Sequence, residues 1–299
     1  MTNRAIIVIT GCTASGKSAA ALKIAKDING VIINADSRQV YKEISIGTAK
    51  PVPEKVEGKV LIIDNIKHYL FSYVSVKEEY NLYKYQKDVF SLLDILPKET
   101  TPILVGGTGL YIDSVVYNYK LKINREKKLD MNLDSLAISK LQELVDKEEF
   151  EKLNESDRQN PRRLMHVISH GLPSIKKGKP LIHKYYFLDI DRDMLRKNIR
   201  FRVEEMLREG LIEENEMIRS KGLIGYSAIN TIGYKEFNGY FEGNKSIDEV
   251  KEEIITHTNQ YAKRQRTWFR KNKEIIYVKD YKEILNSLDT HLESIYPIL

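Results

Sequence analysis

The sequence has little cysteine and no long apolar run, and these two absences exclude several classes of protein. Its single cysteine, Cys12, rules out an internal disulfide and a zinc site built from several thiolates. No apolar stretch approaches the roughly 18 residues that a membrane helix needs. The apolar run near the N-terminus, Ala5–Ile9, is too short for a signal peptide. We therefore expect a cytoplasmic protein with no membrane association.

Acidic residues are absent between Arg158 and Leu188, although the whole chain of 299 residues carries a net charge of only +6. This stretch holds seven basic residues: Arg158, Arg162, Arg163, Lys176, Lys177, Lys179 and Lys184. A second basic cluster consists of Lys263, Arg264, Arg266, Arg270, Lys271 and Lys273. Clustered cations favour a polyanion such as nucleic acid, because each phosphate contact releases counterions. A solvated basic surface is the alternative.

The first third of the chain alternates short apolar runs with helical stretches. The expected buried strands are Ala5–Thr10, Val31–Asn34, Lys59–Asp64 and Pro102–Gly106. Ser75 and Glu78 have capping-box spacing and predict a helix that runs to about Leu96. This alternation predicts an α/β fold with a doubly wound parallel sheet of the P-loop NTPase type.

Residues 120–183 predict a helical insertion, because they contain helical stretches such as Leu133–Asp146 but no convincing strand. The catalytic core would then consist of residues 1–119 and 184–299. In its second part we expect a strand at 184–190, a helix at 191–209 ended by Gly210, and a strand at 274–278. Ser246 and Glu249 form another capping box, which opens a helix with a basic ridge over an apolar seam. The expected seam consists of Val250, Ile254, Thr258, Tyr261, Gln265 and Trp268.

A phosphate-binding loop follows the first expected strand. It matches the pattern Gly-x-x-x-x-Gly-Lys-Ser, and its residues are Gly11, Cys12, Thr13, Ala14, Ser15, Gly16, Lys17 and Ser18. Its backbone N–H groups and the helix N-terminus behind it attract phosphate oxygens. Lys17 can reach a terminal phosphate, and Ser18 can bind Mg²⁺.

Asp36 follows the second expected strand, and ligands bind at this edge of an open α/β sheet. It could hold Mg²⁺, accept a proton from a nucleophile, or merely cap a helix. The run Gly106-Gly107-Thr108-Gly109 ends another strand and either approaches a ligand or permits tight packing. A nucleoside triphosphatase would carry a carboxylate at the end of such a strand, and none is present here.

Taken together, these residues resemble the tRNA dimethylallyltransferase family along nearly the whole chain. The motifs that carry the resemblance are GCTASGKS (11–18), INADSRQVYKEISIGTAKP (33–51), ILVGGTGLYI (103–112), NPRRL (160–164), IGYKEF (232–237) and AKRQRTWFR (262–270). The resemblance implies transfer of a dimethylallyl group from its diphosphate to N6 of the adenosine just 3′ of the anticodon. It also implies a need for Mg²⁺, no need for ATP, and a monomeric state.

The resemblance assigns roles to individual residues. Lys17 and the loop would hold the leaving diphosphate, Ser18 would meet Mg²⁺, and Asp36 would be the general base. Thr108 would help to hold the diphosphate and substrate, and Arg202 would neutralise the leaving group. The helical insertion would grip tRNA. The implied RNA contacts are Asp36, Ser37, Arg38, Gln39, Gln159, Asn160, Pro161, Arg162, Arg163, Gly233, Tyr234 and Lys235, and the basic helix adds Lys263, Arg264, Arg266 and Arg270.

Three other functions share part of this pattern. A small-molecule kinase would turn over ATP and would need a carboxylate of the Walker-B type. A prenyltransferase for free adenine nucleotides would need no basic insertion. A non-catalytic RNA-binding protein would not require Lys17, Ser18 and Asp36. The chain also departs from the family at Cys12, where proline is common, at Asn230, where many members carry a basic residue, and at 167–180.

Overall fold

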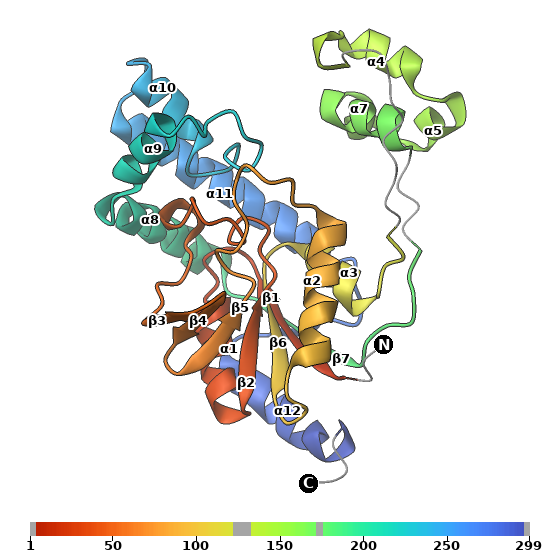
Figure 1. Ribbon diagram of the computed structural model, residues 1–299, viewed down its shortest axis with the longest axis vertical. Coiled ribbons are helices and arrows are strands. Elements are labelled where there is room, and N and C mark those ends of the chain that lie inside the picture. Colours follow the sequence, from red (N-terminus) through yellow and green to blue (C-terminus); the bar gives the residue numbers. More distant parts are fainter. Residues whose placement is uncertain (1–3, 122–132, 172–175, 296–299) are drawn as a thin grey trace. The chain divides into compact units, whose positions relative to one another are not determined.

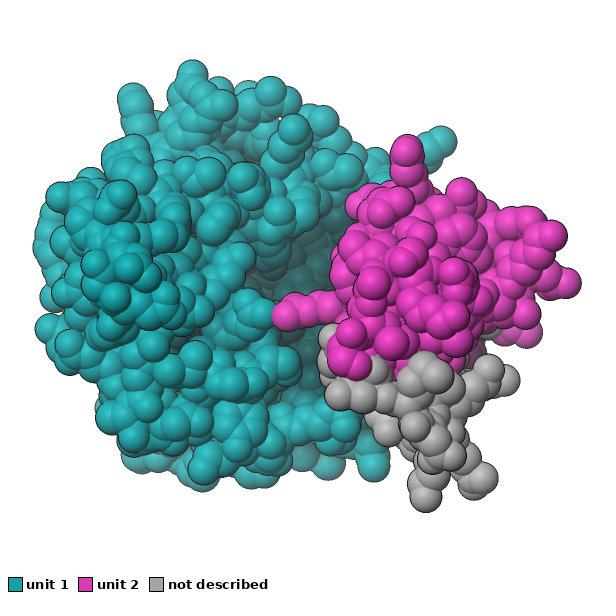
Figure 2. Space-filling model, turned by 90° about the horizontal axis from the view of Figure 1, so that it is seen from above, with its two compact units in different colours: residues 1–118, 179–299 teal, residues 119–178 magenta. Residues whose placement is uncertain are grey.

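The computed structural model of the protein describes residues 4–121, 133–171 and 176–295. The chain divides into two compact units, Met1–Asn118 with Lys179–Leu299 and Tyr119–Gly178 (Figure 2). The boundary at which the chain returns to the larger unit, at 178/179, therefore lies before the expected one at 183/184. Residues 179–183 lead into the sheet, since Leu181 N donates to Val116 O and Ile6 N donates to Ile182 O. Parts of the expected insertion, at 122–132 and 172–175, lie outside the described residues.

The larger unit is built on one sheet whose strands follow the order β3-β4-β5-β2-β6-β1-β7-β8 (Figure 1). The strands are β1 (Ile6–Gly11), β2 (Gly30–Asn34), β3 (Lys55–Glu57), β4 (Val60–Ile63), β5 (Ile66–Tyr69), β6 (Thr101–Gly106), β7 (His183–Leu188) and β8 (Ile276–Val278). From β5 to β8 all neighbours are parallel. β1, β2 and β6 are buried along most of their length, as their runs of branched apolar residues predict.

The strand expected at 59–64 is present as β4, but the prediction that it is buried was wrong. β4 lies between two short antiparallel neighbours at the sheet edge, and only Leu61 in it is buried. Gly58, at φ +62°, joins β3 to β4, and Asp64 and Asn65, both at positive φ, join β4 to β5. Two-residue turns with positive φ favour antiparallel hairpins.

Helices cover both faces of the sheet. Strand residues alternate between the two faces, and Ile7 and Ile9 of β1 belong to the cluster that also contains the buried residues of α1 (Lys17–Asp27) and α12 (Tyr281–Ile295). On the other face Tyr85 of α2 (Leu82–Ile95) stacks on Tyr111 of α3 (Gly109–Val116), and Tyr85 donates to Asn34 O. None of the helices in the described ranges is long and apolar enough to span a membrane.

The expected helix from Ser75 begins only at Leu82. Ser75 and Glu78 form an isolated turn, in which Ser75 N donates to Glu78 Oε1 and Glu78 N donates to Ser75 O. The side chain of Asn81 instead caps α2, accepting from Lys84 N at 3.1 Å. A capping box satisfies its own amides without extending into a helix when a better N-cap follows.

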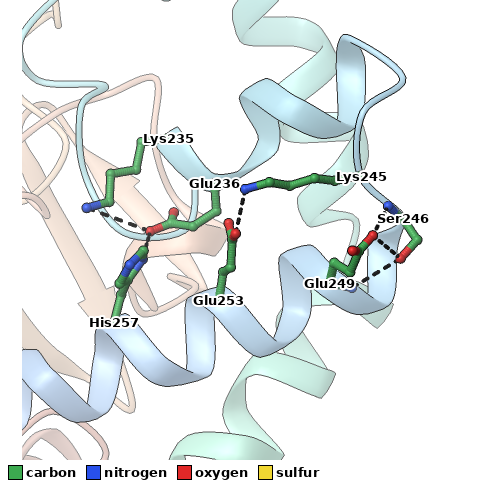
Figure 3. A network of polar contacts seen from close by, with 7 residues as sticks. All are labelled: Lys235, Glu236, Lys245, Ser246, Glu249, Glu253 and His257. Atoms are coloured by element: carbon green, nitrogen blue, oxygen red, sulfur yellow. Dashed lines mark hydrogen bonds and ion pairs between the residues drawn. The ribbon is translucent and has the colours of Figure 1, made fainter.

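The rest of this unit is helical. The elements are α8 (Arg192–Arg208), α9 (Leu211–Ser220), α10 (Asn238–Phe241) and α11 (Ile247–Phe269). Gly210 follows the C-cap of α8 at φ +100°, as expected for a helix end. The predicted capping box at Ser246 and Glu249 is present in α11 (Figure 3). Its predicted seam is wrong at Trp268, which is 40% exposed, because Phe269 is buried instead.

The smaller unit is a cluster of short helices around its own apolar core. Its elements are a 3₁₀ turn at Leu133–Ser135, α4 (Ile138–Leu144), α5 (Lys147–Lys152), α6 (Glu155–Arg158) and α7 (Pro161–His170). The predicted helix at 133–146 is thus shorter than expected. The core consists of Leu141, Val145, Leu153, Leu164, Val167 and Ile168. Asp146, Asn154 and Asn160 cap α5, α6 and α7, which explains the short spacing of these helices.

Candidate functional site

The phosphate-binding loop lies between β1 and α1, and its Gly16 is the N-cap of the helix. Ala14 and Gly16 adopt positive φ values of +62° and +88°, and Ser15 N donates to Cys12 O. No acidic side chain occupies the first turn of α1. The Ser15 hydroxyl is buried and has no hydrogen-bond partner among the residues that the structure describes. These features suit the loop to an anion, and anion binding here stays a prediction.

Two cations, Lys17 and Arg202, meet at this loop. Arg202 of α8 donates to Thr13 Oγ1 at 3.4 Å, and Lys17 Nζ donates to Cys12 O at 3.3 Å. Burial and the positive charge of Arg202 lower the pKa of Lys17 to about 8, and burial lowers the pKa of Arg202. Neither forms an ion pair with a described carboxylate. A bound anion would offset the unfavourable free energy of burying each of these two cations.

Asp36 lies just beyond β2 in a turn that its neighbours fix. Asn34 Oδ1 accepts from Asp36 N at 2.8 Å, and Asn34 Nδ2 donates to Asp36 O at 3.1 Å. One carboxylate oxygen of Asp36 accepts from Arg38 N at 2.8 Å. No helix follows, so the helix-capping interpretation of Asp36 was wrong. The turn leaves the second carboxylate oxygen without a hydrogen bond to the described chain.

Thr108 lies beside Asp36 because the ends of β6 and β2 approach very closely. A Cβ atom on Gly106 would lie 2.2 Å from the carbonyl of Ala35, so only glycine fits there. Thr108 N donates to Ala35 O, and Thr108 Oγ1 accepts from Ser37 N at 3.0 Å. The glycine run thus permits the tight packing that one interpretation predicts, while the approach of a ligand stays a prediction.

Gln265 is a site residue that sequence reasoning missed. It is buried on α11, where its Oε1 accepts from Thr13 N at 2.8 Å and its Nε2 donates to Gly107 O at 2.9 Å. It therefore ties the phosphate-binding loop to the glycine run. The only sequence signal was a polar residue within the apolar seam of this helix, and buried polar groups need partners.

Two cavities meet at these residues. The P-loop cavity, of about 330 Å³, is lined by Lys17 and Ser18 and by the apolar side chains of Leu22, Ile32, Ile63, Phe71 and Val105. The helix cavity, of about 420 Å³, lies against α8 and α11 and is lined among others by Ser37, Arg38, Thr108, Asn230, Lys235 and Tyr261. Both cavities share Thr13, Asp36, Thr48, Ala49 and Arg202. The carboxylate of Asp36 and the guanidinium of Arg202 thus lie where the two chambers join.

The predicted RNA contacts fall into separate groups. Asp36, Ser37, Arg38, Lys235 and Arg264 line the helix cavity, and Lys263 and Arg270 are exposed on α11. In the smaller unit Arg162 is exposed, Arg163 Nε lies 3.8 Å from Asp157, Gln159 ends α6, and Asn160 and Pro161 begin α7.

One of these predictions needs correction, at Tyr234, and three other predicted residues have contacts or a turn within the protein, so that their RNA contacts stay predictions. Tyr234 is only 2% exposed and its hydroxyl donates to Glu214, so it belongs to the core. Gly233 serves the backbone turn, at φ +90°. Gln39 Nε2 donates to the carbonyls of Thr48 and Ala49. Arg266 donates to Asp189 at 2.7 Å, so its guanidinium holds the end of β7.

Comparisons with known proteins agree on one family. A model described as IPP transferase matches residues 39–272, and one described as isopentenyl transferase matches residues 4–67. The tRNA dimethylallyltransferases of Aster yellows witches'-broom phytoplasma and Acholeplasma laidlawii are each 38% identical to this chain; the alignments cover 89% and 88% of both chains.

Solved structures give the same answer for the fold. A tRNA isopentenylpyrophosphate transferase from Staphylococcus epidermidis matches with a TM-score of 0.70 and 31% identity, covering 97% of this chain and 99% of the other. A eukaryotic dimethylallyltransferase acting on tRNA matches with a TM-score of 0.70 and 25% identity, covering 89% of this chain and 70% of the other. The α/β fold predicted from the sequence is therefore confirmed.

Proposed function

The chain belongs to the IPP transferase family, and from this premise we propose that it is a tRNA dimethylallyltransferase. It transfers a dimethylallyl group from dimethylallyl diphosphate to N6 of the adenosine 3′ of the anticodon and releases diphosphate. The observation that carries the proposal is the meeting of the two cavities at Asp36 and Arg202. One chamber suits an allylic diphosphate, and the other suits a base that has left its stack.

The residues around the junction divide the reaction between them. Lys17 and the loop amides hold the diphosphate, and Arg202 faces the oxygen that gains charge as the C1–O bond breaks. The adenine N6 atom forms a bond to C1, and its proton passes to the free oxygen of Asp36. Thr108 and Ser37 fix the wall beside Asp36. Holding both reactants in line supplies much of the remaining rate enhancement.

Mg²⁺ fits this site only together with the diphosphate. No group of three His, Cys, Asp or Glu side chains that could hold a metal occurs in the described ranges. Ser18 lines the P-loop cavity, and Mg²⁺ in phosphate sites commonly keeps several waters and takes few protein ligands. We propose that Ser18 holds the ion, which would neutralise charge on the diphosphate. A monomer in the cytoplasm stays our expectation.

The smaller unit is proposed to grip the tRNA backbone, because its helix α7 begins with exposed basic residues. Replacing Arg162 with glutamate is expected to weaken tRNA binding and to reduce the slope of log K against log salt by about one, as for a lost phosphate contact. Fluorescence titrations of labelled tRNA at several salt concentrations measure this. Lys140→Glu, on the exposed surface of α4, is the matched control. An unchanged slope in Arg162→Glu would place this residue away from the RNA.

The first test of the function is a transfer assay without ATP. Purified protein is incubated with Mg²⁺, unmodified tRNA and radiolabelled dimethylallyl diphosphate, and label in RNA is counted. Label in tRNA but not in free AMP supports the proposal and excludes the prenyltransferase of free nucleotides. No label together with ATP hydrolysis in a parallel assay would mean that the loop serves a kinase. β6, however, ends in Gly106 and offers no carboxylate for such an enzyme.

A further inference from the structure

A fully buried carboxylate lies behind the helix cavity and has no part in the mechanism above. Glu236 belongs to the 3₁₀ turn Lys235–Phe237, and its side chain is 0% exposed (Figure 3). Its Oε1 accepts from His257 Nδ1 at 2.7 Å, and its Oε2 accepts from Gly233 N at 2.9 Å. Lys235 Nζ lies 3.9 Å from Oε1. Because a carboxylate can only accept, Nδ1 of His257 carries a proton.

Glu236 fixes a segment that forms one wall of the helix cavity. Residues 230–235 contribute Asn230, Thr231, Ile232 and Lys235 to its lining. Gly233, whose N–H donates to Glu236, adopts φ +90°. A Cβ atom on Gly233 would lie 3.1 Å from Gly47 O. Gly47 itself lines the same cavity. The segment thus packs closely against Gly47.

The other partner, His257, belongs to the helix that already organises the junction. α11 carries Thr258 and Tyr261 into the helix cavity and Gln265 against the phosphate-binding loop. The bond between His257 and Glu236 therefore connects the 230–235 segment to the same rigid element that holds Thr13. Among the described residues, it is the side-chain bond through which this helix grips the segment.

We propose that Glu236 and His257 are positioning residues for the acceptor nucleic acid, an inference that rests on the proposed function. They touch neither substrate. By locking residues 230–235 against α11, they set the width of the chamber that receives the flipped nucleotide and its neighbours. A loosened segment would still allow the diphosphate to bind and the reaction to proceed once RNA is bound, since Asp36, Lys17 and Arg202 are held by other contacts.

The test uses His257 because Glu236 is buried and its loss could disrupt folding. His257→Ala is expected to raise the KM for an anticodon stem-loop RNA about tenfold, the effect of leaving a buried carboxylate without one hydrogen-bond donor. The KM for dimethylallyl diphosphate and kcat are expected to stay within about twofold of wild type, since kcat at saturation reports the bound state. His257→Gln should recover most of the loss, because its amide N–H can donate to Glu236.

Glu253→Ala is the matched control. It lies one helical turn before His257 on α11 and forms an ion pair with Lys245 at a 37% exposed position, so its loss should leave all three constants unchanged (Figure 3). An unchanged RNA KM in His257→Ala, in an active protein, would overturn the inference alone. Parallel losses in both KM values and kcat would show a general structural role and also overturn it. A wild-type protein that transfers no label would overturn the proposed function together with the inference.

Discussion

Replacing Asp36 with asparagine is expected to lower kcat by about a thousandfold, within the range of general-base catalysis. Asparagine keeps the size of the side chain and can still accept from Arg38 N, so the turn after β2 should stay intact. It cannot take up the N6 proton. The binding of tRNA should therefore change little. Single-turnover transfer of label at saturating RNA and dimethylallyl diphosphate measures the effect, with fluorescence titration of tRNA alongside.

Two further variants make this prediction specific. Asp36→Ala should lose as much activity as Asp36→Asn and in addition some stability, because Arg38 N loses its acceptor. Asp64→Asn, at a 47% exposed residue paired with Lys26, is the control and should leave kcat unchanged. If Asp36→Asn lost tRNA affinity in the same proportion as rate, Asp36 would be an RNA contact rather than the base.

The sequence was most informative where function depends on consecutive residues. The phosphate-binding loop is local, and its backbone geometry follows from the glycines and the helix that must begin at Lys17. Asp36 was placed correctly after the carboxyl end of a strand, but its role stayed open. The turn that replaces a helix there, and leaves one carboxylate oxygen free, depends on hydrogen bonds with Asn34 and Arg38.

What the sequence could not predict depends on contacts between distant residues. Gln265 reaches Thr13 across 252 positions, and its place in the apolar seam of α11 indicates burial but not which groups it contacts. The strands β3 and β5 on either side of β4 are three and four residues long, too short for periodicity to show. Tyr234 belongs to a motif that resembles an RNA-binding segment, yet the structure buries it. A family motif can therefore include residues that only support the wall of the site.

Removing either cation at the junction is the second large effect that we expect. Lys17→Ala and Arg202→Ala should each lower kcat/KM for dimethylallyl diphosphate by about 100- to 1000-fold, the range for losing one donor to a developing negative charge. The double variant should lose less than the product of the two, because each cation repels the other and its removal relieves its neighbour. Steady-state assays of the wild type, the two single variants and the double variant at saturating RNA measure this non-additivity.

The same pair predicts a stability effect of opposite sign. Since burial and Arg202 lower the pKa of Lys17, the two charges oppose folding when no anion is bound. Arg202→Ala should therefore keep or raise the Tm of the free protein while abolishing most of the rise that inorganic diphosphate produces in wild type. Glu252→Ala is the control: it removes the exposed partner of Arg200, which lies on α8 like Arg202, and it should leave that rise intact. If Arg202→Ala destabilised the free protein and left its response to diphosphate unaltered, Arg202 would be a structural residue. Lys17 and the loop amides alone would then have to neutralise the charge of the leaving group.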